Sequence, residues 1–231
     1  MHQRTLLLLS IVAIVAIWQL PYGWQILYPL TLLATFAHEM GHGLAAMLVG
    51  AQFDQLLLNA DGSGVAVWHG NPGRLATALV AAGGLVGPSI AGIGLLLVAR
   101  SQRFARAVLA MLALLLMVSV LAWVRNAFGV VFLLSAAAVL ALAAKVLPAT
   151  MARFVLHLMA ATLCLSWFTD LNYMFSAQAT VNGMVRPSDS AVIAHALWLP
   201  YWFWGGVVAC FSLVVAALGI TFVSRDTGQK R

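Results

Sequence analysis

The sequence is poor in charge. Only 8% of its 231 residues are Asp, Glu, Lys or Arg, whereas 63% are hydrophobic. Soluble globular domains carry about 25% charged residues, so this composition excludes that class of protein, and no segment of the chain departs from it. Long apolar runs instead repeat from end to end. This pattern is typical of a helical membrane protein that crosses the bilayer several times.

Cysteine is also scarce. Cys164 and Cys210 are the only two, and both lie in apolar runs. This favours small buried hydrophobic side chains over a disulfide framework or a metal-binding pair. The net charge of +6 comes from arginines and lysines that lie beside the apolar runs. We therefore attribute the positive charge to the orientation of the helices in a membrane. We expect the chain to lie in a lipid bilayer and not to bind nucleic acid.

The apolar runs predict an all-α polytopic membrane protein with about six to seven transmembrane helices in a single domain, residues 1–231. Residues 1–20 are expected to form a retained anchor helix, because no convincing small-residue cleavage site follows them. Residues 26–175 form the expected core. Residues 191–222 are expected to form a C-terminal helix, and the aromatic belt near its start leaves open that it begins as an interfacial helix. The expected spans run about 5–20, 26–49, 74–99, 104–123, 127–147, 153–175 and 191–222.

One connection has a different pattern. Between residues 51 and 73, apolar residues alternate with others around the turn sequence Asp61-Gly62. Alternation around an Asp-Gly turn predicts a small β-hairpin. Two interpretations remain open: the hairpin is a simple connection, or its open edge pairs with an extended peptide.

The most specific motif contains the only glutamate of the chain. Glu39 lies in His38-Glu39-Met40-Gly41-His42, inside the second apolar span. On a helix, H-E-x-x-H places two imidazoles on one face, where they can share a zinc ion, and the glutamate between them can serve as a general base towards water. Burying these groups in a membrane is costly unless they are paired or bind a metal. The motif therefore indicates a zinc hydrolase.

A catalytic zinc ion takes three protein ligands and leaves a fourth position for water, so a third ligand must come from elsewhere. Asp170 follows the apolar run 154–168 and is our first candidate, because ionisable residues at membrane depth are functional by default. The competing interpretation is that the sixth span ends before Asp170 and leaves it at the interface. Asp189 precedes the last span and reads as an N-cap or first-turn residue, with a third-ligand role as the alternative.

The remaining polar residues have less specific interpretations. Asp61 is explained by turn chemistry, and His157 and His195 as packed or interfacial histidines. Asn126 and Asn172 could donate hydrogen bonds to a tetrahedral intermediate, although helix-end roles explain them equally well.

The run from Phe36 to Ala46, the hairpin that follows it, and a later span with Gly83-Gly84 and Gly87-Pro88 together resemble the site-2 protease family of intramembrane zinc metalloproteases. The likeness is greatest to its compact bacterial branch, which has no PDZ domain. The resemblance implies that His38 and His42 bind zinc and that Glu39 is the catalytic base. The family usually takes its third ligand from an N-x-x-P…D-G motif, which is absent here. A Ser-Asp-small motif recurs in the compact branch, which keeps Asp189 as the alternative to Asp170.

We therefore expect a zinc metalloendopeptidase, located in a bacterial inner membrane, that cleaves peptide bonds within or beside transmembrane segments of other membrane proteins. Two other functions remain open. A divalent-cation transporter could use the same histidines and Asp170, although no internal repeat is visible and a transporter needs no glutamate between them. A non-catalytic membrane adaptor of the same family is the third interpretation.

Overall fold

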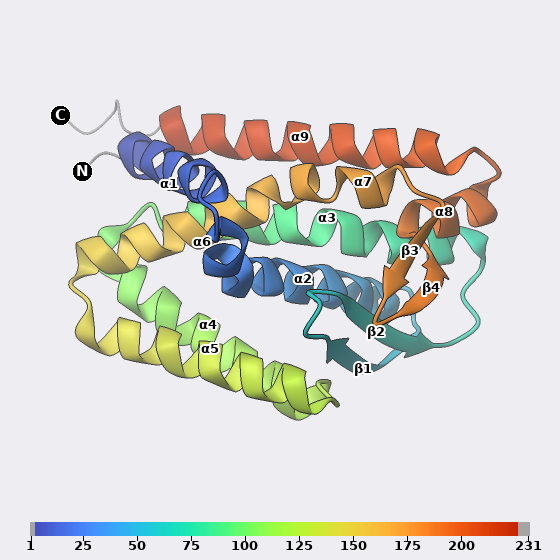
Figure 1. The fold of residues 1–231 in the computed structure, drawn as a ribbon, viewed down its shortest axis with the longest axis horizontal. Coiled ribbons are helices and arrows are strands. Elements are labelled where there is room, and N and C mark those ends of the chain that lie inside the picture. The colour runs from blue at the N-terminus through green and yellow to red at the C-terminus, as the bar shows by residue number, and fades with distance from the viewer. Residues whose placement is uncertain (1–2, 226–231) are drawn as a thin grey trace.

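The computed structural model describes residues 3–225, which form a bundle of helices with two small β-hairpins (Figure 1). Both hairpins and helix α8 lie towards one end of the bundle. In chain order the elements are α1 (Gln3–Trp18), α2 (Gly23–Leu48), β1 (Gln52–Leu58), β2 (Gly64–His69), α3 (Arg74–Val98), the 3-10 turn η1 (Gln102–Phe104), α4 (Ala105–Ala122), α5 (Ala127–Val146), α6 (Ala149–Thr169), α7 (Leu171–Met174), β3 (Gln178–Val181), β4 (Met184–Pro187), α8 (Asp189–Leu197) and α9 (Tyr201–Arg225).

Within the described residues, five helical segments are long and apolar enough to cross a membrane: Arg74–Val98, Gln102–Ala122, Ala127–Val146, Ala149–Thr169 and Tyr201–Gly219. Thr5–Trp18 adds a shorter apolar helix. Helix α2 is 26 residues long and is not among the five; it carries the polar histidine motif. These features confirm the helical membrane fold predicted from composition.

Helix α3 is the centre of the bundle and packs against α2, α6, α8 and α9. Its contact with α2 depends on glycine. A Cβ atom added at Gly41 would lie 2.3 Å from the carbonyl oxygen of Gly83, so the two backbones approach too closely for any side chain. Small residues allow such close helix packing in membranes. The contact brings the histidine motif of α2 directly beside α3.

The hairpin predicted between residues 51 and 73 is confirmed. Strands β1 and β2 pair antiparallel, with a register shift between Phe53 and Gln55. The outer edge of β1 is also covered, because the Leu56 amide donates to the Trp123 carbonyl and the Arg125 amide donates to the Leu56 carbonyl. The open edge of this sheet is therefore that of β2.

The structure corrects the prediction for the end of the chain. Residues 191–222 were expected as one helix, but α8 ends at Leu197 and α9 begins at Tyr201. Trp198 adopts a left-handed conformation with φ of 66°, and Pro200 cannot continue a hydrogen-bonded helix.

A second hairpin, β3–β4, was not predicted. Its strands pair antiparallel from Gln178 to Pro187. Asn182 and Gly183 form the turn with φ of 49° and 75°, as the two central residues of a tight hairpin turn require. This hairpin places the start of α8 beside the other polar residues of the bundle.

Candidate metal centre

The two histidines of the motif lie on one face of α2. His38 and His42 are separated by four residues, close to one helical turn. Their Nε2 atoms are 3.1 Å apart. The two rings meet edge to face, which points both Nε2 atoms at the same small volume.

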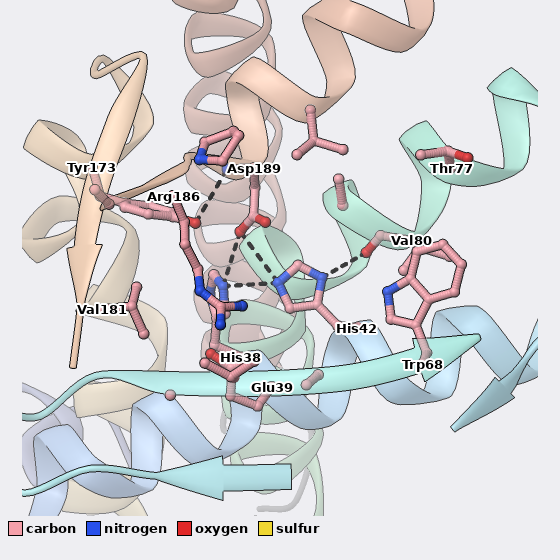
Figure 2. Close-up of a pocket in the computed structure, with 17 residues that line it drawn as sticks. His38, Glu39, His42, Trp68, Thr77, Val80, Tyr173, Val181, Arg186 and Asp189 are labelled. Carbon is pink, nitrogen blue, oxygen red and sulfur yellow. Dashed lines mark hydrogen bonds and ion pairs between the residues drawn. The ribbon is translucent and has the colours of Figure 1, made fainter. Parts of the chain in front are cut away.

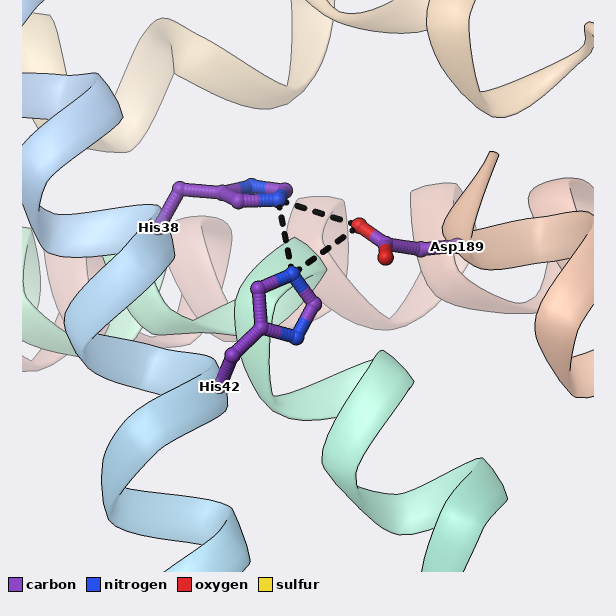
Figure 3. Close-up of side chains that lie close together, drawn as sticks. All are labelled: His38, His42 and Asp189. Atoms are coloured by element: carbon purple, nitrogen blue, oxygen red, sulfur yellow. Dashed lines mark hydrogen bonds and ion pairs between the residues drawn. The ribbon is translucent and has the colours of Figure 1, made fainter. Parts of the chain in front are cut away.

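A carboxylate from the far end of the chain completes the group. Oδ2 of Asp189 lies 3.0 Å from Nε2 of His38 and 3.2 Å from Nε2 of His42. Figure 3 shows the three side chains converging from α2 and α8. All three are shielded from solvent, and no other group of three potential ligands occurs in the part of the chain that the structure describes.

Local hydrogen bonds fix where Asp189 begins its helix. Ser188 is the N-cap of α8, and its hydroxyl accepts from the Ala191 amide and donates to the Ser176 carbonyl at 2.5 Å. The Asp189 amide donates to the Tyr173 hydroxyl at 3.1 Å. Asp189 is thus the first residue of α8, where a negative charge is favoured by the helix dipole.

Helix α3 orients His42. The Nδ1 atom of His42 lies 2.8 Å from the Val80 carbonyl oxygen. A carbonyl only accepts, so in the neutral imidazole the proton is on Nδ1 and Nε2 presents a lone pair. Gly84 leaves room for the ring, because a Cβ atom there would lie 2.1 Å from Nε2 of His42.

This donor set fits a zinc ion. Zinc binds histidine nitrogen at about 2.0–2.1 Å and carboxylate oxygen at about 2.0–2.2 Å. A tetrahedron of that size separates neighbouring ligand atoms by about 3.3–3.5 Å, within a few tenths of the observed 3.0, 3.1 and 3.2 Å. The lone pair of His42 also faces a carboxylate oxygen, an arrangement that a cation between them would stabilise.

Glu39 lies next to this group. Its side chain is buried, with 6% of its surface exposed, and strand β2 covers it closely. A Cβ atom at Gly64 would lie 2.6 Å from Cγ and 2.8 Å from Oε1 of Glu39. Glycine at this position therefore lets β2 pass over the carboxylate.

A cavity of about 380 Å³ opens onto the group (Figure 2). His38, Glu39, His42 and Asp189 all line it. The remaining lining comes from β2, α3, the β3–β4 hairpin, Tyr173 and Val192. A substrate segment could reach all four polar residues from this one space.

The electrostatics favour an ionised Asp189. Burial by itself raises the pKa of the Asp189 carboxyl, but His42 and His38, when their rings are protonated, hold that pKa well below its usual range. Burial, followed by the negative charge of Asp189, raises the pKa of the Tyr173 phenol. Asp189 is therefore available as an anionic ligand, and Tyr173 keeps its proton as a donor.

Asp170, our first candidate for the third ligand, does not belong to the group. Helix α6 ends at Thr169, and Asp170 follows as its C-cap. Its carboxylate lies 3.5 Å from the Thr169 hydroxyl and lines a neighbouring cavity of about 230 Å³. The structure thus supports the competing interpretation, in which the helix ends before Asp170.

The two asparagines do not line the 380 Å³ cavity. Asn126 instead binds the backbone of β1: its side-chain oxygen accepts from the Leu58 amide at 3.2 Å, and its amide group donates to the Leu58 carbonyl. Asn172 is exposed on α7. Sequence reasoning instead missed Tyr173 and Arg186, which do line the cavity; their residue types carry no motif that would have singled them out.

Comparison with known proteins agrees with this geometry. No curated protein and no solved structure matches the chain. The Peptidase M50B-like family model, however, matches residues 7–219, nearly the whole chain. That range includes the histidine motif, both hairpins and Asp189. The resemblance to the site-2 proteases seen in the sequence is therefore confirmed, and the chain belongs to the Peptidase M50B-like family of metallopeptidases.

Proposed function

We propose that the protein is an intramembrane zinc metalloprotease that hydrolyses peptide bonds within or beside transmembrane segments of other membrane proteins. The observation that carries the proposal is the convergence of His38, His42 and Asp189 beside Glu39 in one cavity. Because α8 completes a group that α2 begins, we treat the chain as a single domain. A bacterial inner membrane is its proposed location.

The residues that line the cavity divide into metal ligands, a general base and a hydrogen-bond donor. His38, His42 and Asp189 would hold the zinc ion, with Asp189 as the third protein ligand. When bound, zinc activates water and polarises the scissile carbonyl. Glu39 takes a proton from the attacking water and passes it to the leaving amine. The protonated phenol of Tyr173 lines the same cavity and is a candidate donor to the oxygen that gains charge in the transition state.

The cavity edge suggests how a substrate binds. Gly64, Val65, Ala66 and Trp68 of β2 line the cavity, and the other edge of this sheet is already covered at β1. A substrate helix must unwind before its carbonyl groups can be attacked. An unwound segment could add to the open edge of β2 as a further strand, which would present its backbone to Glu39.

The second cavity suggests how water reaches the site. It shares His38 and Glu39 with the first cavity, and its lining includes the hydroxyl side chains of Thr31, Thr35, Ser63, Ser166, Thr169 and Tyr173. Polar groups at membrane depth line water-filled spaces. We propose that water enters through this cavity, with Asp170 as one of the groups that hydrate it.

The first test is the zinc content of purified protein in detergent. We expect about one zinc per chain in the wild type and in Glu39→Gln, because the glutamate is not a ligand. Asp189→Asn should lose most of the metal, since it removes the anionic ligand. Asp170→Asn is the matched control, the same substitution at a neighbouring carboxylate, and should retain zinc.

Cleavage of a tagged single-span reporter protein separates ligand from base. Glu39→Gln should bind zinc but leave the reporter intact. A wild type that remains free of zinc when the metal is supplied would refute the protease proposal and favour the adaptor. Loss of zinc from Asp170→Asn with retention in Asp189→Asn would refute our assignment of the third ligand.

A further inference from the structure

Arg74, the first residue of α3, binds the end of α8 that is remote from the metal centre. Its Nε donates to the Ala196 carbonyl at 3.0 Å, and an Nη atom lies 3.4 Å from the His195 carbonyl. The guanidinium carbon also lies 3.8 Å from the centre of the Trp198 ring. One side chain thus makes a hydrogen-bond fork and a cation–π contact with the last turn of α8.

These contacts hold the C-terminal end of a short helix whose N-terminal end is held by the hydrogen bonds of Ser188 and Asp189. Helix α8 has only nine residues, so its first and last residues lie about 12 Å apart. The last carbonyl groups of a helix lack partners within the helix, and a cation there also suits the helix dipole. Because Asp189 is the first residue of α8, a shift of the helix along its axis moves the carboxylate by the same amount.

The same helix that carries Arg74 also orients His42. Val80 accepts the hydrogen bond from the His42 ring, and Gly84 makes room for that ring. Helix α3 therefore contacts the His42 ring from α2 directly and, through Arg74, the far end of the helix that carries Asp189.

We infer that Arg74 is a positioning residue for the metal centre, which sets the distance of Asp189 from the two histidines by holding α8 against α3. This inference rests on the proposed zinc site. A lysine should replace it poorly, because its ammonium group lacks the planar fork that binds two carbonyl groups and stacks on an aromatic ring. Mutation of groups bonded directly to metal ligands typically changes metal affinity by about 10- to 100-fold. Arg74 acts at the other end of the helix, so we expect an effect at the lower end of that range.

The chain contains a matched control for helix capping alone. Arg106 on α4 binds the last turn of α5 in the same way, with Nε 2.6 Å from the Ala144 carbonyl and an Nη atom 2.7 Å from the Lys145 carbonyl. Neither Arg106 nor α5 lines the cavity at the metal centre. Loss of this fork should therefore affect stability without affecting the metal.

The test compares Arg74→Gln, Arg74→Lys and Arg106→Gln in the full chain. Zinc dissociation constants would be measured by competition with a chelating dye, and the visible absorption of the Co²⁺-loaded proteins would report ligand geometry. We expect Arg74→Gln to weaken zinc binding about 10-fold and to alter the Co²⁺ spectrum. Arg74→Lys should show a smaller change in the same direction, and Arg106→Gln should match the wild type in both measurements.

The possible results distinguish failure of the positioning role from failure of the proposed zinc site. Wild-type zinc affinity and spectrum in both Arg74 variants would overturn the positioning role while leaving the zinc site intact. Equal losses in Arg74→Gln and Arg106→Gln would also overturn it, because they would show a general loss of structure. Should Arg74→Gln fail to fold, Arg74→Lys decides the question by the same two measurements. A wild type that binds neither metal would refute the proposed function and this inference together.

Discussion

The two hairpins on either side of the cavity differ in how they are held. The β1–β2 hairpin is built into the bundle: Leu56 and Leu58 are 0% exposed. Asn126 binds the backbone of β1. Its turn is attached to α2, because the Tyr28 hydroxyl donates to the Ala60 carbonyl and the Thr35 hydroxyl donates to the Gly62 carbonyl.

The β3–β4 hairpin has far fewer attachments. All four residues of β4 are exposed. At its tip, the Asn182 amide donates to the Asp61 carboxylate at 3.2 Å, which joins the turns of the two hairpins. At its base, the Ser188 amide donates to the Ala177 carbonyl.

The difference shows which wall of the cavity is fixed. Strand β2 lies over Glu39 and pairs with β1, whose Leu56 and Leu58 are buried, so it keeps a constant position relative to the histidine motif. The β3–β4 hairpin is joined to the first hairpin by the hydrogen bond from the Asn182 amide to Asp61, so separating the two requires that bond to break. Local opening favours segments with few buried contacts, so a substrate segment should enter by displacing β3–β4.

The largest effect should come from disturbing the fixed wall at Gly64. Gly64→Ala forces the Glu39 side chain to move, since the added Cβ would lie 2.6 Å from its Cγ. A displacement of about 1 Å at a catalytic group can lower the rate about 100-fold. We expect that loss in reporter cleavage with zinc content unchanged. Gly73→Ala, where nothing lies within 4 Å of the added atom, should cleave normally; full activity in Gly64→Ala would contradict the close contact.

An intermediate effect should follow from releasing β1. Asn126→Ala leaves the amide and carbonyl of the buried Leu58 without their side-chain partner. An unsatisfied buried polar group costs about 1–3 kcal/mol, and we expect a loss of unfolding free energy in that range, measured by denaturation in detergent. Asn172→Ala, the same substitution at an exposed site, should change it little. Equal stability of the two variants would show that the hairpin is held by apolar packing alone.

The smallest effect should come from separating the hairpin tips. Asp61→Ala removes the acceptor of the Asn182 amide, and we expect faster hydrogen exchange at residues 178–187 and, in the first hairpin, at the Ser63 amide, which also donates to Asp61. Asp54→Ala, an exposed aspartate of the same β1–β2 hairpin that pairs with His69, is the control and should leave that exchange unchanged. Faster exchange across the whole bundle would contradict a local contact.

The pH dependence of this contact follows from the same carboxylate. The hydrogen bond from the Ser63 side chain lowers the pKa of Asp61. A carboxyl group with a lowered pKa contributes its contact above its ordinary pKa and loses it as pH falls through the folded value. Exchange at residues 178–187, corrected for intrinsic rates, should therefore be the same at pH 5 and pH 7. A marked rise in corrected exchange at pH 5 would argue against this.

The sequence predicted those features that local patterns specify. Long apolar runs gave the helices, and the alternation around Asp61-Gly62 gave the first hairpin. The second hairpin has strands of only four residues, too short for alternation to be informative. Asn182-Gly183, a strong turn signal, was the one available clue. The break between α8 and α9 was likewise signalled only by Pro200.

The candidate site divides in the same way. His38, Glu39 and His42 are close in sequence, so helical periodicity alone predicts that they share a face. Asp189 is far from them along the chain, and its placement depends on the packing of α8 against α3, which no local pattern encodes. From the sequence, Asp170 was preferred to Asp189 as the third ligand because it follows an apolar run. The end of α6 at Thr169, visible only in the structure, places it in the neighbouring cavity.

A single residue, Ser188, separates the end of β4 at Pro187 from Asp189 at the start of α8. Movement of the β3–β4 hairpin and movement of Asp189, the proposed third ligand, are therefore linked through a single residue. Any outward movement of β4 must be absorbed by rotation at Ser188 or passed on to the carboxylate, and the hydrogen bonds of Ser188 to Ser176 and Ala177 resist it. The position of Asp189 therefore depends on whether Ser188 keeps these hydrogen bonds when the β3–β4 hairpin moves.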